Sequence, residues 1–442
     1  MNPLARPTFG VNHVLGYGQS LSSGWEGWPA LSTTPRYDSL MLGNSVRPVR
    51  EQAPHWEPVG EPQFRRLAAT VQDVGSGMLL GPNVVARLLR GNAALGETVL
   101  EAAVNAWRAR LQSDPDFITG SQRLLASSCG VGGRGIEWLA KGAGPELFNR
   151  LCECAQLAKR TAAAHGLGYG VVALLFLQGE HNNFGADGAT ADRDEYKRLL
   201  RQLYHDFVAE VAFAIAGQSA PPAIFLHQTG GAYATDTNAI PQAQLESALE
   251  LPGCFLAAPA YPVTSKGGHL DANGYRWVGA QFGKVMHRVL TLGEAWKPLY
   301  PLWSAIDGRQ LLVHFHAPVP PLAWGMPLNG HAPVAYADRG FTVSDTGGLV
   351  PIAEVALFDA LTIRITMERP PGDGALLRYA DRAHGGRGML RDSDGTVAND
   401  CYAFDAHTGH YPSAEVPDLV GRPYPLQNWC VAFNLPLRRP NA

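Results

Sequence analysis

The first 290 residues alternate short apolar runs with helical patterns, and this alternation limits the possible folds more than any other feature of the chain. The apolar runs occupy residues 11–17, 123–127, 170–177, 223–227 and 254–258. Helical patterns fall at residues 84–90, 96–111, 145–165, 193–216 and 272–290. Such alternation predicts a parallel sheet with helices on both faces. Ligands of these sheets bind outside the carboxyl ends of the strands, so we expect a site at that edge.

The pattern changes near residue 295. Downstream, strand-like runs at residues 310–316, 334–337, 355–358, 361–367, 375–379 and 428–435 are separated by clusters of Pro, Gly and Asp. This spacing predicts an antiparallel β-sandwich. At 442 residues, the chain is also longer than most single domains built around one hydrophobic core. We therefore predict an α/β domain of three α/β/α layers over residues 1–295, followed by a β-sandwich accessory domain over residues 296–442.

Composition narrows the range of partners. A formal charge of −3 gives no reason to expect nucleic acid or an anionic membrane as a partner, and 46% hydrophobic residues are typical of a folded protein. The N-terminus has no apolar stretch of signal-peptide length, and no run approaches the roughly 18 apolar residues of a membrane span. We expect a cytoplasmic protein, or one that is virion-associated or released by lysis. The oligomeric state is not indicated.

The six cysteines form no CxxC motif and no cluster of zinc-ligand type, so they predict no metal site. Cys401 and Cys430 are candidates for a disulfide, which the sequence leaves open.

A serine follows the first predicted strand. The segment Gly18-Gln19-Ser20-Leu21 comes directly after the apolar run, and its glycine permits a tight bend. A serine in this position can be held rigidly and still meet a substrate, although most turn serines only satisfy backbone groups. Ser20 is therefore a candidate nucleophile.

Three later segments offer partners for such a serine. The glycine-rich segment at residues 130–136 matches GxGxxG, and dinucleotide binding, close packing of a turn and an amide donor to an oxyanion all remain open. Gln178, in the sequence Gln-Gly-Glu after the third strand, offers a side-chain amide at the sheet edge. His269, just before the last helix, is a candidate general base. No G-x-S-x-G elbow and no P-loop motif is present.

In this order, the four segments resemble the sequence blocks of the SGNH (GDSL-like) hydrolases. The resemblance is greatest to the carbohydrate esterases that are similar to sialate O-acetylesterase and acetylxylan esterase. In those proteins the blocks read GQSN, a GG turn, QGE and D-x-x-H. The resemblance covers roughly residues 11–290, and the later region more loosely resembles the β-rich domain of phage-tail-associated esterases.

The resemblance implies serine ester hydrolysis, with removal of O-acetyl groups from a carbohydrate as the favoured reaction. Ser20 would be the nucleophile and His269 its base. The oxyanion hole would comprise the backbone N–H groups of Ser20 and of Gly132 or Gly133, with the Gln178 amide. An acetylated glycan or another small ester would be the substrate, without any cofactor. Separately, Trp25 and Trp28 lie just after the nucleophile and would either stack on sugar rings or pack as a lid.

Two positions depart from the family pattern. Leu21 replaces the usual Asn, and Lys266 stands three residues before His269, where the family has an orienting Asp. We expect a backbone carbonyl or another acid, with Glu180 and Asp271 as local candidates, to orient His269 unless the site is impaired. Two alternatives therefore remain: a non-catalytic glycan-binding or phage-tail structural protein, and an esterase that acts on lipid or aryl esters.

Overall fold

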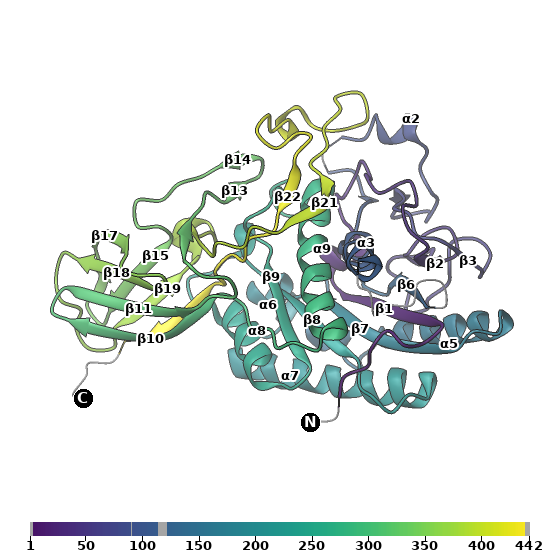
Figure 1. The fold of residues 1–442 in the computed structure, drawn as a ribbon, viewed down its shortest axis with the longest axis horizontal. Coiled ribbons are helices and arrows are strands. Elements are labelled where there is room, and N and C mark those ends of the chain that lie inside the picture. Colours follow the sequence, from purple (N-terminus) through teal and green to yellow (C-terminus); the bar gives the residue numbers. More distant parts are fainter. Residues whose placement is uncertain (1–2, 90, 114–121, 438–442) are drawn as a thin grey trace.

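The computed structural model describes residues 3–89, 91–113 and 122–437. Its centre is a seven-stranded sheet with the strand order β3-β2-β6-β1-β7-β8-β9 (Figure 1). All neighbouring strands in it are parallel except β3, which runs antiparallel to β2. Its strands are β1 (Val11–Gly18), β2 (Leu40–Leu42), β3 (Phe64–Arg66), β6 (Arg123–Ser128), β7 (Tyr169–Leu177), β8 (Ala223–Gln228) and β9 (Cys254–Pro259).

Helices cover both faces of this sheet. One face packs against α3 (Val99–Gln112) and α9 (Ala272–Met286), and the other packs against α5 (Asn149–Ala164), α7 (Arg193–Asp206) and α8 (Ala239–Glu250) (Figure 1). The central strands β1 and β7 are buried along their whole length, as expected for parallel strands covered on both sides. The predicted α/β fold class is thus confirmed.

Two short strands at one edge of the sheet, β2 and β3, escaped the sequence analysis because each has only three residues. The expected helix at residues 84–90 is also much shorter, since α2 covers only Pro82–Val85, and residue 90 lies outside the described residues. The expected helix at residues 193–216 is divided, because α7 is followed by π-helical turns at Phe207–Ala216. No described helix combines the length and the apolar character that crossing a bilayer would require.

The C-terminal part is β-rich and antiparallel. One four-stranded sheet has the order β10-β11-β18-β17 and another the order β16-β15-β19-β23. Their strands are β10 (Tyr300–Asp307), β11 (Gln310–His316), β15 (Phe341–Asp345), β16 (Gly348–Val350), β17 (Ile352–Leu357), β18 (Thr362–Met367), β19 (Leu376–Tyr379) and β23 (Phe433–Pro436). Phe315 and Phe433 connect the two sheets, with ring centroids 6.2 Å apart. The expected strand at residues 334–337 is absent; this segment forms a loop and turn.

The candidate disulfide does not form in this structure. Cys401 is exposed, Cys430 is buried, and both are free thiols.

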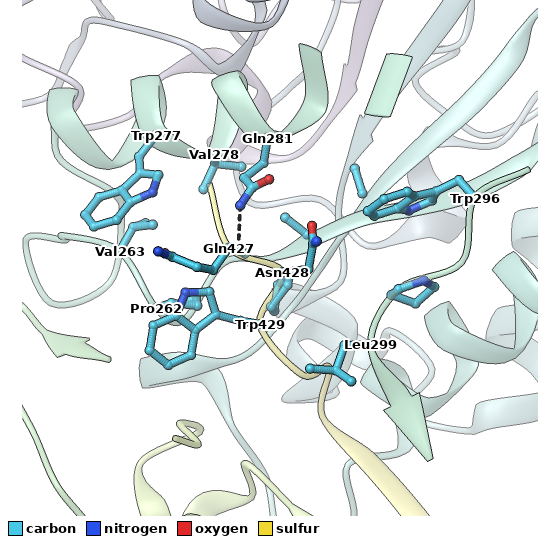
Figure 2. A pocket seen from close by; sticks show the side chains of 14 residues that line it. Pro262, Val263, Trp277, Val278, Gln281, Trp296, Leu299, Gln427, Asn428 and Trp429 are labelled. Carbon is cyan, nitrogen blue, oxygen red and sulfur yellow. Dashed lines mark hydrogen bonds between the residues drawn. The ribbon is translucent and has the colours of Figure 1, made fainter. Parts of the chain in front are cut away.

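Helix α9 holds the C-terminal segment against the α/β part. Gln281 Nε2 on α9 donates a hydrogen bond to the carbonyl oxygen of Gln427 at 2.7 Å (Figure 2). Trp277, Trp296 and Trp429 surround this junction and leave a cavity of only about 20 Å³. The junction is therefore a packed contact with no room for a ligand.

Gln228, fully buried at the end of β8, makes another connection between the two parts. Its Nε2 donates to the carbonyl oxygens of Pro241 and Ala432, both at 2.9 Å, and its Oε1 accepts from Ala432 N at 2.7 Å. One side chain thus satisfies three buried backbone groups far apart in the chain.

Replacing Gln228 with Leu should lower the free energy of unfolding by about 2–4 kcal/mol, because a buried polar group left without a partner costs about 1–3 kcal/mol. Chemical denaturation monitored by circular dichroism measures the change. Gln202→Leu, on the exposed face of α7, is the matched control and should change stability by less than about 0.5 kcal/mol. Equal effects of the two substitutions would contradict the role given to Gln228.

Candidate active site

Neighbouring strands bring the nucleophile segment beside the Gln-Gly-Glu segment. Gly18, the last residue of β1, pairs with Leu177, the last residue of β7. Gly18 has a φ of 133°, and a Cβ on it would lie 2.1 Å from the carbonyl oxygen of Leu177. Only glycine permits this conformation at this distance. The residues that follow the two strands therefore emerge side by side at the carboxyl edge of the sheet.

Ser20 and His269 meet at this edge. Ser20 begins the short helix α1 (Ser20–Ser23), and His269 lies in the loop between β9 and α9. Ser20 Oγ and His269 Nε2 are 2.9 Å apart, although the residues are 249 positions apart in the chain. This is the distance expected between a nucleophilic hydroxyl and its general base.

Glu26 supplies the carboxylate on the other side of the imidazole. Its Oε2 lies 3.3 Å from His269 Nδ1, and the two side chains are 14% and 23% exposed. A proton on Nδ1 that is donated to this carboxylate leaves Nε2 free to accept the Ser20 hydroxyl proton. Glu26 was not predicted from the sequence, because the acids expected to orient His269, Glu180 and Asp271, were those in the Gln-Gly-Glu and histidine segments. The available signal was an acid between Trp25 and Trp28, just after the nucleophile.

The backbone around Glu26 is held in an unusual conformation. Glu26 has a φ of 58°, in the left-handed region that few non-glycine residues adopt. The flanking backbone is hydrogen-bonded to a neighbouring segment, from Gly96 N to the Gly24 carbonyl at 2.8 Å and from Glu97 N to the Gly27 carbonyl at 2.6 Å. These bonds fix the segment that points the Glu26 carboxylate at His269.

Lys266 stabilises the same segment from the other side. Its Nζ donates a hydrogen bond to the Trp28 carbonyl at 2.7 Å and lies 3.3 Å from the centre of the Trp28 ring and 4.5 Å from that of Tyr411. Lys266 thus binds the backbone two residues beyond Glu26. Trp28 itself is fully buried, so the suggested stacking of Trp28 on a sugar is wrong, and its ring packs inside the protein.

The two acids suggested as partners of His269 are bound elsewhere. Glu180 Oε1 lies 2.7 Å from His227 Nε2, and Asp271 Oδ2 lies 2.8 Å from His331 Nε2. Burial raises the pKa of both carboxyls, but the hydrogen bond and the charge of the histidine beside each outweigh it, so that both pKa values lie below their usual range. Both acids are therefore ionised members of separate pairs.

Two of the expected oxyanion donors already have acceptors in the protein. Gln178 Nε2 donates to Asn182 Oδ1 at 2.5 Å and lies 3.3 Å from the Arg134 carbonyl oxygen. The backbone N–H of Gly132 donates to Glu51 Oε1. Gln178 is fully buried and is not among the residues that line the pocket.

The backbone N–H groups of Ser20 and Gly133 differ in this respect. Within the described ranges, neither has an acceptor in the protein, and both residues line the pocket. They are therefore free to donate to a ligand.

A pocket of about 430 Å³ opens over Ser20 and His269. Polar and aromatic side chains share its lining, contributed by Gln19, Trp25, Gln52, Glu180, His181, Phe184 and Tyr233. Trp25 stacks on the His269 ring with centroids 6.1 Å apart, and Phe184 contacts Tyr233 at 5.6 Å. Burial and the nearby charges of Glu180 and Glu26 raise the pKa of Tyr233 to about 12, so its hydroxyl keeps its proton at neutral pH.

In the part of the chain that the structure describes, no group of three or more His, Cys, Asp or Glu side chains is arranged to hold a metal ion. The chemistry available to the pocket from this chain is thus that of a hydroxyl, an imidazole, a carboxylate and hydrogen-bond donors.

Comparison with known proteins finds a similarity in fold alone. No family model matches the chain, and no curated protein matches it. A solved carbohydrate acetylesterase from Xanthomonas citri is 14% identical, with a TM-score of 0.53, over 97% of this chain and 81% of that one. The chain shares the fold of this acetylesterase.

Two other solved structures are more distant. NanS is 11% identical over 60% of this chain and 81% of that chain, with a TM-score of 0.36. A carbohydrate acetylesterase family member from Sinorhizobium meliloti is 15% identical over 63% of this chain and 99% of that chain, with a TM-score of 0.30. Of these three structures, the Xanthomonas protein is the one with a TM-score above 0.5, and at 14% identity its similarity concerns the fold alone.

Glu26→Gln should lower kcat for an ester substrate by about 10²–10⁴. The neutral amide does not stabilise the imidazolium, and it also allows the His269 tautomer with the proton on Nε2, which cannot accept the Ser20 proton. The corresponding change in a serine triad costs about 10⁴ in kcat. Steady-state kinetics on p-nitrophenyl acetate measure the loss.

Glu57→Gln, an exposed change on a neighbouring loop, serves as the matched control and should leave kcat within about twofold of the parent. A Glu26→Gln variant as fast as this control would show that the carboxylate does not orient His269.

Proposed function

We propose that this protein is a serine esterase that removes O-acetyl groups from a carbohydrate, with Ser20, His269 and Glu26 as its catalytic triad. The observation that carries the proposal is the contact of Ser20 Oγ with His269 Nε2 while Glu26 lies against Nδ1. The sequence blocks similar to those of SGNH hydrolases and the fold shared with an acetylesterase support it.

In the acylation step, Ser20 Oγ attacks the acetyl carbonyl carbon while His269 Nε2 takes the hydroxyl proton. The resulting tetrahedral oxyanion is stabilised by N–H donors in the pocket. When it collapses, the bond to the sugar oxygen breaks, and His269 passes its proton to that oxygen. The deacetylated sugar leaves, and the acetyl group remains on Ser20.

Deacylation repeats these steps with water. His269 takes a proton from a water molecule, whose oxygen attacks the acetyl carbon on Ser20. Collapse of the second tetrahedral species breaks the bond to Oγ, returns the proton to Ser20 and releases acetate. Throughout, Glu26 keeps the proton on Nδ1 and stabilises the imidazolium that forms transiently.

The lining of the pocket favours a sugar over a long acyl chain. Trp25, Phe184 and Tyr233 offer aromatic surface, while Gln52 and His181 offer polar groups. Sugars combine apolar ring faces with hydroxyl groups and can use both kinds of surface. A long alkyl chain would leave the polar groups unpaired.

Ser20→Ala and His269→Ala should each lower kcat for p-nitrophenyl acetate by at least about 10³, because the members of a catalytic triad act as a unit. Circular dichroism and thermal unfolding of the variants establish that the fold is kept.

Ser22→Ala is the control, since Ser22 Oγ donates a hydrogen bond to the carbonyl oxygen of Gln19 and Ser22 is not among the residues that line the pocket. It should keep the rate within about threefold. A parent enzyme without turnover, or one whose rate survives Ser20→Ala, would refute the serine-esterase proposal and favour the binding-protein alternative.

Acyl-chain preference distinguishes deacetylation from action on lipid esters. Because polar side chains lie among the aromatic ones in the pocket lining, kcat/KM for p-nitrophenyl acetate should exceed that for p-nitrophenyl octanoate by at least about tenfold, a discrimination within reach of pocket contacts. The ratio is measured on both esters under the same conditions. A preference for octanoate would instead support the lipid-esterase alternative.

A further inference from the structure

Gln19, the residue before the nucleophile, has a side-chain amide whose orientation is fixed by the backbone. Its Oε1 accepts hydrogen bonds from the backbone N–H of His181 at 3.1 Å and of Gly179 at 3.4 Å. A backbone N–H can only donate, so the oxygen of the amide must face these two groups and the nitrogen must face away from them.

Gln19 is also one of the residues that line the candidate pocket. It lines the same cavity as Ser20 and His269, although the residue as a whole is only 5% exposed. Among the described residues, no acceptor in the protein bonds its Nε2. A fixed, nearly buried amide with a free N–H₂ group beside the nucleophile is a preorganised donor, and donors of this kind are the largest single source of transition-state stabilisation in many enzymes.

The competing donors are already occupied. Gln178 Nε2 donates hydrogen bonds to Asn182 Oδ1 and to the Arg134 carbonyl oxygen. The backbone N–H of Gly132 donates to the Glu51 carboxylate. To donate to a substrate, each of these two groups would have to give up a hydrogen bond within the protein. Gln19 Nε2 and the N–H groups of Ser20 and Gly133 have no acceptor among the described residues and would give up none.

We infer that Gln19 is a catalytic residue whose Nε2 donates to the oxyanion, together with the backbone N–H of Ser20 and of Gly133. The inference rests on the proposed serine-esterase function, and it gives Gln178 the role of a positioning residue. Gln178 Nε2 lies 3.4 Å from Gln19 Oε1, so it helps to hold the Gln19 amide in place.

The decisive variants are Gln19→Glu and Gln19→Met. Gln19→Glu keeps an oxygen for the two backbone donors and removes the N–H₂ group, while Gln19→Met removes the donor without adding charge. Because loss of one oxyanion donor costs about 10²–10³ in kcat, both should lower kcat for p-nitrophenyl acetate by at least about 10², with KM within about threefold of the parent.

A second readout separates this role from a structural one. A trifluoromethyl ketone forms a tetrahedral adduct with a serine oxygen, whereas p-nitroacetanilide resembles the bound ground state. The inhibition constant of the ketone should rise by about the same factor as kcat falls, and the affinity for the anilide should stay within about threefold. Gln202→Glu, which adds the same charge on the exposed face of α7 and outside the pocket lining, is the control and should leave both within about twofold.

The outcomes are distinguishable. If Ser20→Ala abolishes turnover while both Gln19 variants keep kcat within about threefold, the esterase function stands and the Gln19 inference falls. Equal weakening of the ketone and the anilide would also overturn it, because that result indicates a general disturbance of the pocket. If Ser20→Ala retains the parent rate, the proposed function itself fails.

Discussion

The close backbone contact between the ends of β1 and β7 is the constraint on which the site depends. Gln19 N donates to the carbonyl oxygen of Leu177 at 2.9 Å directly after the glycine that allows the strands to approach. On the other side, a Cβ on Gly130 would lie 1.7 Å from Ser22 Oγ, so the turn after β6 presses equally closely on the nucleophile segment. Ser20 is thereby held between two turns, with its neighbours at van der Waals distance.

The placement of charge around His269 is the second constraint. Lys266 stands three residues before the histidine, and the acid that faces the imidazole is Glu26. These two charged residues act on the same segment. The Lys266 ammonium binds the Trp28 carbonyl and ring, which stabilises the segment that carries Glu26. A charged hydrogen bond of this kind contributes about 1.5–3 kcal/mol, and a cation over a tryptophan about 0.5–2 kcal/mol.

Long strands that are buried on both faces could be predicted from the sequence, whereas very short or irregular strands could not. The five predicted strands of the parallel sheet are present because long apolar runs buried on both faces leave a clear pattern. Strands β2 and β3 are too short to show one. In the C-terminal part, β11 and β18 alternate buried and partly exposed residues and were placed well, while β10 is interrupted by a bulge and was missed.

Apolar periodicity and the order of short motifs are local properties of the chain, so they sufficed to predict the parallel sheet with its helical layers and to single out Ser20 and His269. The folded structure was needed to show which acid faces His269, which amides have no acceptor among the described residues, and that Trp28 is buried. These depend on a left-handed backbone at Glu26 and on hydrogen bonds between distant segments. The spacing of motifs in the sequence does not predict these contacts, because a carboxylate or an amide acts through its position in space and not through its place in the chain.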